Sequence, residues 1–508
     1  MAQDVLQFAR GSIAAGRADL AITALRELTE RERRNAAAWK LLGHACHEEQ
    51  LEPEAAAALA RAAALDDRDV QTALAHAQSA YHAGFPAVDL FQHVMQLAPG
   101  DLNALRGYAS ALAVAGQSAA AAAVLHAAVK DRPDWLEGHR ALATLRYTGG
   151  DQSHFADSYA SACAAQPHNL ALRMAWFRAV AQTRDWTAAS AIIDSAERLL
   201  GRKPQLLIAR LFVASESGDT VQAQRLFADT ASLDDLVRDL ALIRHCLRTG
   251  ELETAETTAV RHVDTASAAV VWPYLSLVWR LLGSPRAEWL DGSPPYVRAF
   301  ELDFSAVELD RIANLLRQLH TARSPFVEQS VRGGTQTDQN LLLRHEPVLR
   351  DLKVRIQAAV GRYVAQLPPP VPGHPLLGIE RVDPLRGRVF FSGSWSVRLT
   401  TQGYNVSHTH PLGWISSALY ISLPTPAGMG PPPAGWLQFG TPPAELNLQL
   451  QPCLQVEPRA GQLLLFPSRM WHSTVPFADG ERLVVAFDVR APRASALAAT
   501  NKQRKQTA

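Results

Sequence analysis

Four polar residues in the last quarter of the sequence have types and spacing suited to metal chemistry. His408 and His410 stand one residue apart in the stretch YNVSHTHPLGW, just before an apolar run. His472 follows a second apolar stretch, GQLLLFP, and Arg482 comes soon after it. Imidazole nitrogens bind iron, zinc and copper, and an arginine fork binds carboxylates with two hydrogen bonds. An H-x-H pair alone is more often structural, but the combination predicts a metal site.

Other reactive groups form no comparable pattern. The four cysteines, Cys46, Cys163, Cys246 and Cys453, lie far apart without a C-x-x-C pair, which predicts neither a disulfide framework nor a thiolate metal site. The polar stretch at 328–337 carries two glycines and is predicted to be a loop, either a substrate-side lid or a well-bonded turn. It lacks the Lys-Ser/Thr of a phosphate-binding P-loop.

The histidines belong to a region whose pattern predicts a β domain. Near residue 290 the stretch DGSPPYVRAF ends a long helical pattern. Apolar residues three and four apart then predict helices at 305–321 and 346–367. Short runs of β-formers separated by glycine and proline predict a sandwich or barrel. These predicted strands are 388–401, 415–424, 435–440, 461–467 and 482–490.

The first half of the chain repeats with a period of 34 residues. Pro99, Pro133 and Pro167 are equally spaced, and the stretch WKLLGHAC fits the opening of a tetratricopeptide repeat. Alanines on facing helices allow close approach, while leucines fill the gaps between hairpins. The period slips after about residue 170. We therefore predict an α-solenoid over 1–290, degenerate beyond 170, with a non-repeating helical domain as the alternative.

Charge and hydropathy argue against nucleic acid and membranes as partners. The 508 residues include 50 Lys+Arg and 49 Asp+Glu, a formal charge of +1 without a long basic stripe, so nucleic acid is not an expected partner. No window reaches the roughly 18 apolar residues of a membrane span, and the start of the chain has no signal-peptide pattern, so a cytoplasmic location is expected. The small and polar residues of 493–508 predict a disordered tail.

Several motifs of the β region resemble one enzyme family. From about 291 to 490 the chain is similar to the bacterial 2-oxoglutarate and iron(II) dependent oxygenases, in the branch often fused to tetratricopeptide repeats. The resemblance implies a double-stranded β-helix, or jelly roll, with flanking helices over 291–492, and hence a multidomain α plus β chain. It rests on EQSVRGGTQT, HTHPLGWISSALYISLP, GQLLLFPSRMWHSTVPF and ERLVVAFDV.

The resemblance also implies the ligands of the metal. In this family a histidine, a carboxylate two residues later and a distal histidine hold iron(II) on one face. His408 matches the first ligand and His472 the distal one, while His410 stands at the carboxylate position. The expected site is therefore a face of three histidines, or two histidines with a water. In an alternative register, His410 is the first ligand and Leu412 takes the carboxylate position.

The same resemblance assigns the co-substrate. Arg482 is expected to bind the distal carboxylate of 2-oxoglutarate, unless it only caps a strand at the surface. Tyr420 is a candidate second donor to that carboxylate, or a core residue. Arg398 and Asn405 precede or adjoin the metal motif and are candidates to face the pocket.

The implied activity is hydroxylation with iron(II), 2-oxoglutarate and dioxygen. A repeat array offers a concave surface, so the expected substrate is a protein or peptide docked there. Two alternatives remain open: a cupin-like enzyme that uses three histidines without 2-oxoglutarate, for which Arg482 is dispensable, and a non-catalytic scaffold without tight metal binding.

Overall fold

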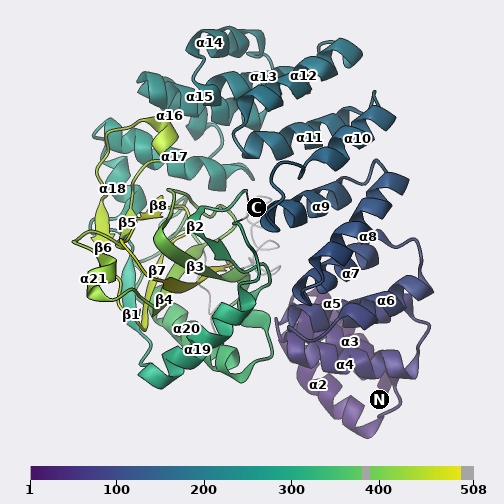
Figure 1. Cartoon of the computed structure of the whole chain (residues 1–508). Helices are drawn as coiled ribbons and strands as arrows, with labels where there is room; N and C mark the ends of the chain where they lie inside the picture. The colour runs from purple at the N-terminus through teal and green to yellow at the C-terminus, as the bar shows by residue number, and fades with distance from the viewer. Residues whose placement is uncertain (1, 326, 380–388, 493–508) are drawn as a thin grey trace, which may run out of the picture.

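The chain changes from helices to strands part-way along its length (Figure 1). The computed structural model describes residues 2–325, 327–379 and 389–492. Helices α1 to α18, residues 2–291, are named the helical array here, and residues 298–489, from the first strand to the last, the β domain. The predicted disordered tail, 493–508, lies outside the described residues, as does residue 388 at the start of one predicted strand.

The helical array is built from helices joined in pairs by tight turns. Its members are α1 (Ala2–Ala14), α2 (Ala18–Arg31), α3 (Ala36–Glu48), α4 (Glu52–Leu65), α5 (Val70–His82), α6 (Val88–Leu97), α7 (Leu102–Val114), α8 (Ser118–Asp131) and α9 (Leu136–Thr148). The array continues with α10 (Asp157–Ala165), α11 (Leu170–Gln182), α12 (Trp186–Leu200), α13 (Pro204–Ser217), α14 (Thr220–Asp229), α15 (Leu236–Thr249), α16 (Leu252–Val260), α17 (Ala268–Leu281) and α18 (Arg286–Asp291).

Local signals recur along the array at the repeat period. Asn35, Asp69, Asp101 and Asn169 each cap the helix that opens a hairpin by accepting hydrogen bonds from its first backbone N–H groups. Gly43 permits close helix packing, because a Cβ there would overlap the side chain of Leu59 on the partner helix. The fold class predicted for this part of the chain, a helical repeat array, is confirmed.

The backbone keeps the period beyond residue 170, where the proline signal fades. A residue with positive φ follows the first helix of each hairpin, and successive examples are 32 to 34 residues apart. These residues are Gly16, Gln50, Gly84, Gly116, Gly150, Arg184, Gly218, Gly250 and Gly283. The turn geometry therefore persists through α17, although the proline spacing that indicates the repeat in the sequence ends near residue 170.

The β domain contains two antiparallel sheets that face each other. Its strands are β1 (Arg298–Glu301), β2 (Val331–Gln336), β3 (Phe391–Asn405), β4 (Ile415–Ser422), β5 (Leu437–Phe439), β6 (Leu454–Val456), β7 (Gln462–Pro467), β8 (His472–Thr474) and β9 (Arg482–Val489). The larger sheet has the order β1-β7-β4-β9-β3-β2 and the smaller one β6-β5-β8. This arrangement confirms the predicted jelly-roll class.

Helices cover only the outer face of the larger sheet. Alternate residues of β4, β7 and β9, such as Leu419, Leu465 and Val485, pack against α19 (Ala306–Leu319) and α20 (Pro347–Ala365). The intervening residues, such as Ala418, Leu464 and Val484, point to the smaller sheet and form a second core. Short elements η1 (Leu341–Leu343), α21 (Pro426–Met429) and η2 (Ala444–Leu446) complete the domain. Residues of opposite faces thus alternate along every central strand.

The predicted elements of this region have structural counterparts, with one correction. The expected strands correspond to β3, β4, β5, β7 and β9, and the two expected helices to α19 and α20. The stretch at 328–337 is not simply a loop, because Val331–Gln336 forms β2 and pairs with β3. The prediction failed because the two glycines suggested a turn, whereas they sit at an irregularity between Arg332 and Gly334 in the strand pairing.

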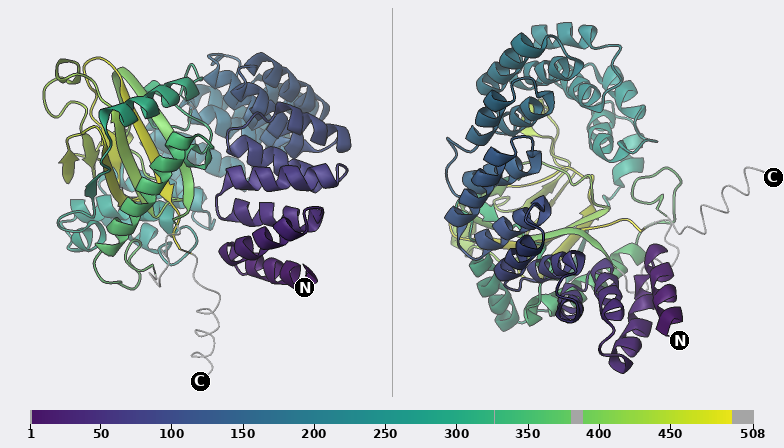
Figure 2. Two further views of the ribbon diagram at one scale, coloured as in Figure 1. Left: turned by 90° about the horizontal axis from the view of Figure 1, so that it is seen from below. Right: turned by 90° about the vertical axis from the view of Figure 1, so that its right-hand side faces the viewer.

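The helical array curves around the β domain (Figure 2). Contacts come from the turn that follows the first helix of several hairpins. Gln50 exchanges hydrogen bonds of 2.7 and 3.0 Å with the backbone of Phe391, and the backbone N–H of His345 donates to the carbonyl of Ala83 at 2.8 Å. Further along, Gln182 donates to Glu328 at 2.5 Å. One edge of the array therefore faces the β domain.

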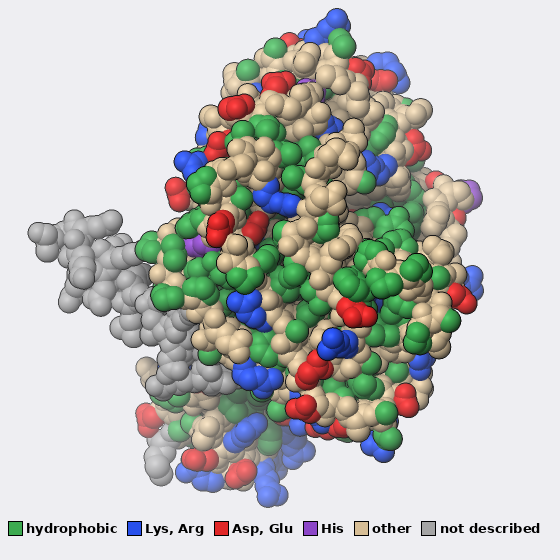
Figure 3. Space-filling model, turned by 90° about the vertical axis from the view of Figure 1, so that its left-hand side faces the viewer, with side chains coloured by type: hydrophobic (Ala, Val, Ile, Leu, Met, Phe, Trp, Pro, Cys, Tyr) green, Lys and Arg blue, Asp and Glu red, His purple; other side chains and the backbone are tan. Residues whose placement is uncertain are grey.

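Surface chemistry is mixed on the face of the β domain turned away from α1–α9. Figure 3 shows Lys and Arg side chains interspersed with Asp, Glu and apolar groups, without a continuous basic band in that view. Among the residues described, no helix combines the length and the apolarity needed to cross a bilayer.

A buried ion pair joins the end of the array to the β domain and predicts a stability effect. Arg469 donates to the carboxylate of Asp291 at 2.8 Å and also binds the carbonyl of Leu290. Arg469→Ala would leave the Asp291 carboxylate buried with Ser276 as its remaining partner. We expect a loss of about 3 kcal/mol, read as a lower urea midpoint.

The matched control removes an exposed arginine of the array. Arg202 pairs with Asp229 at 3.4 Å with both side chains more than half exposed. Exposed pairs contribute little, so Arg202→Ala should leave the urea midpoint nearly unchanged. Equal midpoints for the two variants would show that the Arg469 pair does not stabilise the junction.

Candidate metal centre

The three predicted histidines meet where two strand ends are joined by backbone hydrogen bonds. The N–H of His408 donates to the carbonyl of His472, and the N–H of His472 donates back, both at 3.1 Å. His472 begins β8, which pairs with β5, so the short sheet fixes the position of this bridge. The segment that carries His408 and His410 is thereby held against β8 although most of it is not in a strand.

The three imidazole rings converge closely. Ring centroids are 4.2 Å apart for His408 and His472, 5.0 Å for His408 and His410, and 5.1 Å for His410 and His472. One ring nitrogen of each lies within 4.8 Å of the others. This spacing suits three ligands about 2.1 Å from one metal ion.

Hydrogen bonds fix which nitrogen of each ring faces the centre. Nδ1 of His408 lies 2.8 Å from the carbonyl oxygen of Val406, and Nδ1 of His472 lies 2.9 Å from that of Met470. A carbonyl only accepts, so each Nδ1 carries the proton and each Nε2 keeps its lone pair. The hydroxyl of Ser330 lies 3.2 Å from Nε2 of His408 and can donate to it. Metal-binding histidines are typically oriented in this way.

Burial favours the neutral rings that a metal needs. Desolvation, together with the neighbouring His410, lowers the pKa of His408 to about 3. Burial and the neighbouring His408 hold the pKa of His472 well below its ordinary value. Both rings are therefore neutral donors at physiological pH, ready to bind a cation without first losing a proton.

A carboxylate lies directly behind the third ring. Nδ1 of His410 lies 2.8 Å from both carboxylate oxygens of Asp488 and donates its proton to them. The hydroxyl of Ser416 also donates to this carboxylate, at 2.5 Å. An imidazole that donates to a carboxylate is a stronger metal ligand. Asp488 would therefore act on the metal through the His410 ring, whereas a coordinating carboxylate acts directly.

The two predicted co-substrate residues are buried together. Arg482 is 2% exposed and Tyr420 is fully buried, with the guanidinium 5.0 Å from the centre of the phenol ring. Arg482 donates to the carbonyl of Gly435 at 2.6 Å, but its Nε and the hydroxyl of Tyr420 have no hydrogen-bond partner among the residues described. Burial lowers the pKa of Arg482 and raises that of Tyr420.

The remaining sequence candidates divide between the centre and the surface. Asn405 donates to Ser330 at 2.9 Å and so adjoins the triad through that hydroxyl. Arg398 instead donates to Glu481 at 2.6 Å in a half-exposed ion pair. Leu412 is 87% exposed, which disfavours the register that places it at the carboxylate position.

Two residues of the centre carried no predicted role. Asp488 lies in the quoted stretch ERLVVAFDV, and period-two alternation puts it on the same face of β9 as Arg482, a signal that was available in the sequence. Trp395 lies over His410 with ring centroids 5.4 Å apart, on a strand whose facing partner cannot be read from local pattern.

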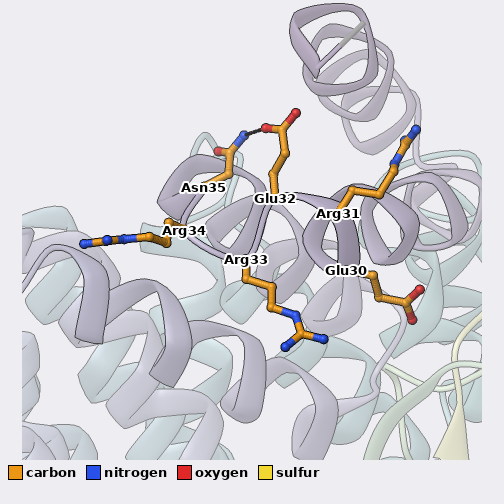
Figure 4. Close-up of a pocket in the computed structure, with 6 residues that line it drawn as sticks. All are labelled: Glu30, Arg31, Glu32, Arg33, Arg34 and Asn35. Carbon is orange, nitrogen blue, oxygen red and sulfur yellow. Dashed lines mark hydrogen bonds between the residues drawn. The ribbon is translucent and has the colours of Figure 1, made fainter.

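A separate surface hollow lacks the character of a site. It has a volume of about 630 Å³ and lies on the turn between α2 and α3, in a different part of the chain from the histidines (Figure 4). Its side chains alternate in charge and point in different directions, and Asn35 donates to Glu32 within it. No set of ligand atoms converges there.

The donor set fits the metal and co-substrate of the resemblance. Three converging imidazoles suit a divalent iron ion, although the usual coordinating carboxylate is replaced by His410. Within the described part of the chain the buried guanidinium has no acidic partner and the buried phenol no acceptor, a costly state that a bound anion would relieve. A dicarboxylate such as 2-oxoglutarate would satisfy both groups.

Sequence comparison agrees with this geometry. Residues 393–488 match the family described as "Putative 2OG-Fe(II) oxygenase". The C-terminal part of the chain is a domain of this family. The match spans the three histidines, Tyr420, Arg482 and Asp488, while no curated protein matches the chain.

Solved structures resemble each half of the chain. A tetratricopeptide repeat protein from Parabacteroides merdae has 12% identity and a TM-score of 0.31, covering 51% of this chain and 98% of that one. The viral collagen prolyl hydroxylase of Paramecium bursaria Chlorella virus-1 has 14% identity and a TM-score of 0.26, with 39% and 97% covered. A Pseudomonas putida prolyl-4-hydroxylase has 17% and 0.26, with 39% and 93% covered. Because all these TM-scores are below 0.5, the family assignment rests on the sequence match.

The contact between Asp488 and His410 predicts a loss of metal affinity on substitution. Asp488→Asn keeps the shape of the side chain but removes one acceptor and the negative charge. We expect the Co(II) that depends on His472 to bind about 10- to 100-fold more weakly. Co(II) titration followed by absorbance measures this, with the His472→Ala variant defining the signal of the centre.

An exposed carboxylate on a nearby turn provides the control. Asp479 accepts a hydrogen bond from Thr401 and contacts none of the three histidines. Asp479→Asn should leave Co(II) affinity unchanged. Equal affinity in the Asp488 and Asp479 variants would show that His410 is not a ligand oriented by Asp488.

Proposed function

We propose that this chain is a 2-oxoglutarate and Fe(II) dependent dioxygenase that hydroxylates a protein or peptide recruited by its helical array. The observation that carries the proposal is Arg482, a buried guanidinium on the inner face of the sheet that also carries Asp488, with no acidic partner among the residues that the structure describes. A structural arginine in such a core would need a carboxylate from the protein. A co-substrate anion supplies that carboxylate.

In this proposal each residue of the centre has one task. His408, His410 and His472 hold the metal through Nε2, and Asp488 keeps His410 oriented. Arg482 binds the distal carboxylate of 2-oxoglutarate, with the Tyr420 hydroxyl as a second donor. Iron(II) with 2-oxoglutarate and dioxygen supplies the oxidising power, with succinate and carbon dioxide as products.

One side of the centre is an apolar wall. Phe466 lies against the ring of His472, with centroids 4.8 Å apart, and belongs to an apolar core with Phe439, Met470 and Val484. A dry, low-dielectric pocket strengthens the pairing of Arg482 with an anion and protects a reactive oxidant from side reactions.

A polypeptide substrate is supported by the position of the array. Glu328 contacts Gln182 at 2.5 Å and lies 3.8 Å from Arg140, both on the array. Two residues later, Ser330 lies against Nε2 of His408. A segment held by the inner edge of the array would therefore lie near the metal centre, which favours an extended substrate over a small molecule.

Uncoupled turnover tests the reaction class. With Fe(II), 2-oxoglutarate, ascorbate and oxygen but no added substrate, the wild-type chain should form succinate and His472→Ala should not. Arg482→Ala should raise the KM for 2-oxoglutarate about 10- to 100-fold, because a charge-assisted hydrogen bond contributes roughly 1.5–3 kcal/mol. Arg482→Lys should recover part of the loss.

Arg398→Ala is the matched control, since it removes a half-exposed guanidinium from the neighbouring strand β3. It should leave the KM for 2-oxoglutarate unchanged. Metal binding with no dependence on 2-oxoglutarate or Arg482 would favour a three-histidine enzyme of the cupin kind. Failure to bind either metal or 2-oxoglutarate would favour the scaffold.

Isotope transfer tests the class of substrate. A cell extract is incubated with the full chain, 2-oxoglutarate and ¹⁸O-labelled dioxygen, with His472→Ala as the background. We expect label in acid-precipitated polypeptide, located by mass spectrometry, because the array holds an extended chain. Label confined to the small-molecule fraction would overturn the polypeptide substrate while leaving the reaction class intact.

A further inference from the structure

A second group of potential metal ligands lies in the helical array, away from the oxygenase-family domain's histidines. His47 is near the end of α3, Glu52 opens α4, and His82 ends α5. One ligand atom of each lies within 4.8 Å of the others. His47 and His82 occupy nearly equivalent places in consecutive repeats, so stacking of the repeats brings their rings to 6.4 Å at an angle of 18°.

The carboxylate of this group is buried without sufficient partners. Glu52 has only 2% of its side chain exposed. Its Oε1 lies 2.8 Å from Nδ1 of His47 and 3.9 Å from Nδ1 of His82. Its Oε2 and the Nδ1 of His82 have no hydrogen-bond partner among the residues described. A buried carboxylate oxygen left in this state is costly, and a cation would remove the cost.

A lysine close to this group makes its hydrogen bond elsewhere. Lys353 of α20 approaches from the β domain, but its ammonium group donates to the carbonyl of Gln50 at 2.8 Å. The side chain of Gln50 binds the backbone of Phe391. Lys353 and the backbone of Phe391 thus both hydrogen-bond to Gln50, while Glu52 faces the two histidines.

We propose that His47, Glu52 and His82 bind a divalent transition-metal ion of the zinc type and so join two consecutive repeats. Two imidazole nitrogens and one carboxylate oxygen are a common ligand set for zinc, with a fourth position left for water. The side chains of His47 and His82 are 46% and 40% exposed, which gives the ion a path from solvent. Glu52 supplies the fixed, buried end of the site.

A bound ion would stiffen the contact between the array and the β domain. Glu52 lies two residues after Gln50, whose side chain holds Phe391 at the start of β3. An ion that ties α3, α4 and α5 together would stiffen the turn that carries Gln50. Binding to the folded state alone raises thermal stability, so zinc should raise the unfolding midpoint of the full chain.

Zinc content of the full-length chain tests the proposal directly. Protein stripped with chelator is reloaded with zinc, dialysed and measured by atomic emission. Relative to wild type, His82→Ala and Glu52→Gln should each lose about one zinc per chain, independently of any zinc held by the oxygenase-family domain. The control is His76→Ala, a half-buried histidine on the same helix α5 that is outside the group; it should lose none.

Thermal shifts separate this site from the other histidines. The zinc-induced rise in midpoint should persist in His472→Ala and should disappear when Glu52→Gln, a substitution of the same shape that keeps the helix intact, is added to that variant. Full zinc content in both Glu52→Gln and His82→Ala would overturn the proposal. So would a shift that disappears in His472→Ala and persists in Glu52→Gln, because the ion would then bind only in the β domain.

Discussion

Two backbone hydrogen bonds between His408 and His472 hold the geometry on which the rest of the centre depends. They join a segment with little regular structure to the first residue of β8, and the N–H of His410 extends the connection by donating to Ser468 at 2.8 Å. Side-chain ligands on independent loops would need to be ordered at an entropic cost when metal binds. Here His472 is ordered before any metal binds, because it pairs with Phe439 of β5 in the smaller sheet.

Two buried charges of the centre lie on one strand. Asp488 and Arg482 share the inner face of β9, with the apolar residues Val484 and Ala486 between them. The negative end stands behind a metal-facing imidazole and the positive end lies near the hydroxyl of Tyr420. A buried cation and anion that do not pair with each other are stable only if each has another partner. Asp488 has such partners in His410 and Ser416, whereas for Arg482 the proposed function supplies the carboxylate of 2-oxoglutarate.

Sequence reasoning captured what repeats and what alternates. The 34-residue period predicted the array, and period-two runs predicted five of the strands, since both follow from local packing. The strand β2 was not predicted, because Gly333 and Gly334 favour a turn locally and the pairing of β2 with β3 is a tertiary effect. The site was predicted largely through family resemblance. Asp488 was missed because its partner, His410, is distant in sequence and meets it only across the folded sheet.

The mode of docking explains how an array and an enzyme domain can act as one unit. A free repeat array is stabilised only by neighbouring repeats, so its curvature is soft. Here the β domain contacts the turns near Gln50, Ala83 and Gln182, which are spaced along the array by whole repeats. These contacts span the array and fix its curvature. The last of them, Glu328, lies two residues from Ser330 at the metal centre. The array also reaches the surroundings of the histidines through Trp471, next to His472, whose indole donates to the carbonyl of Pro273 on α17 at 2.9 Å.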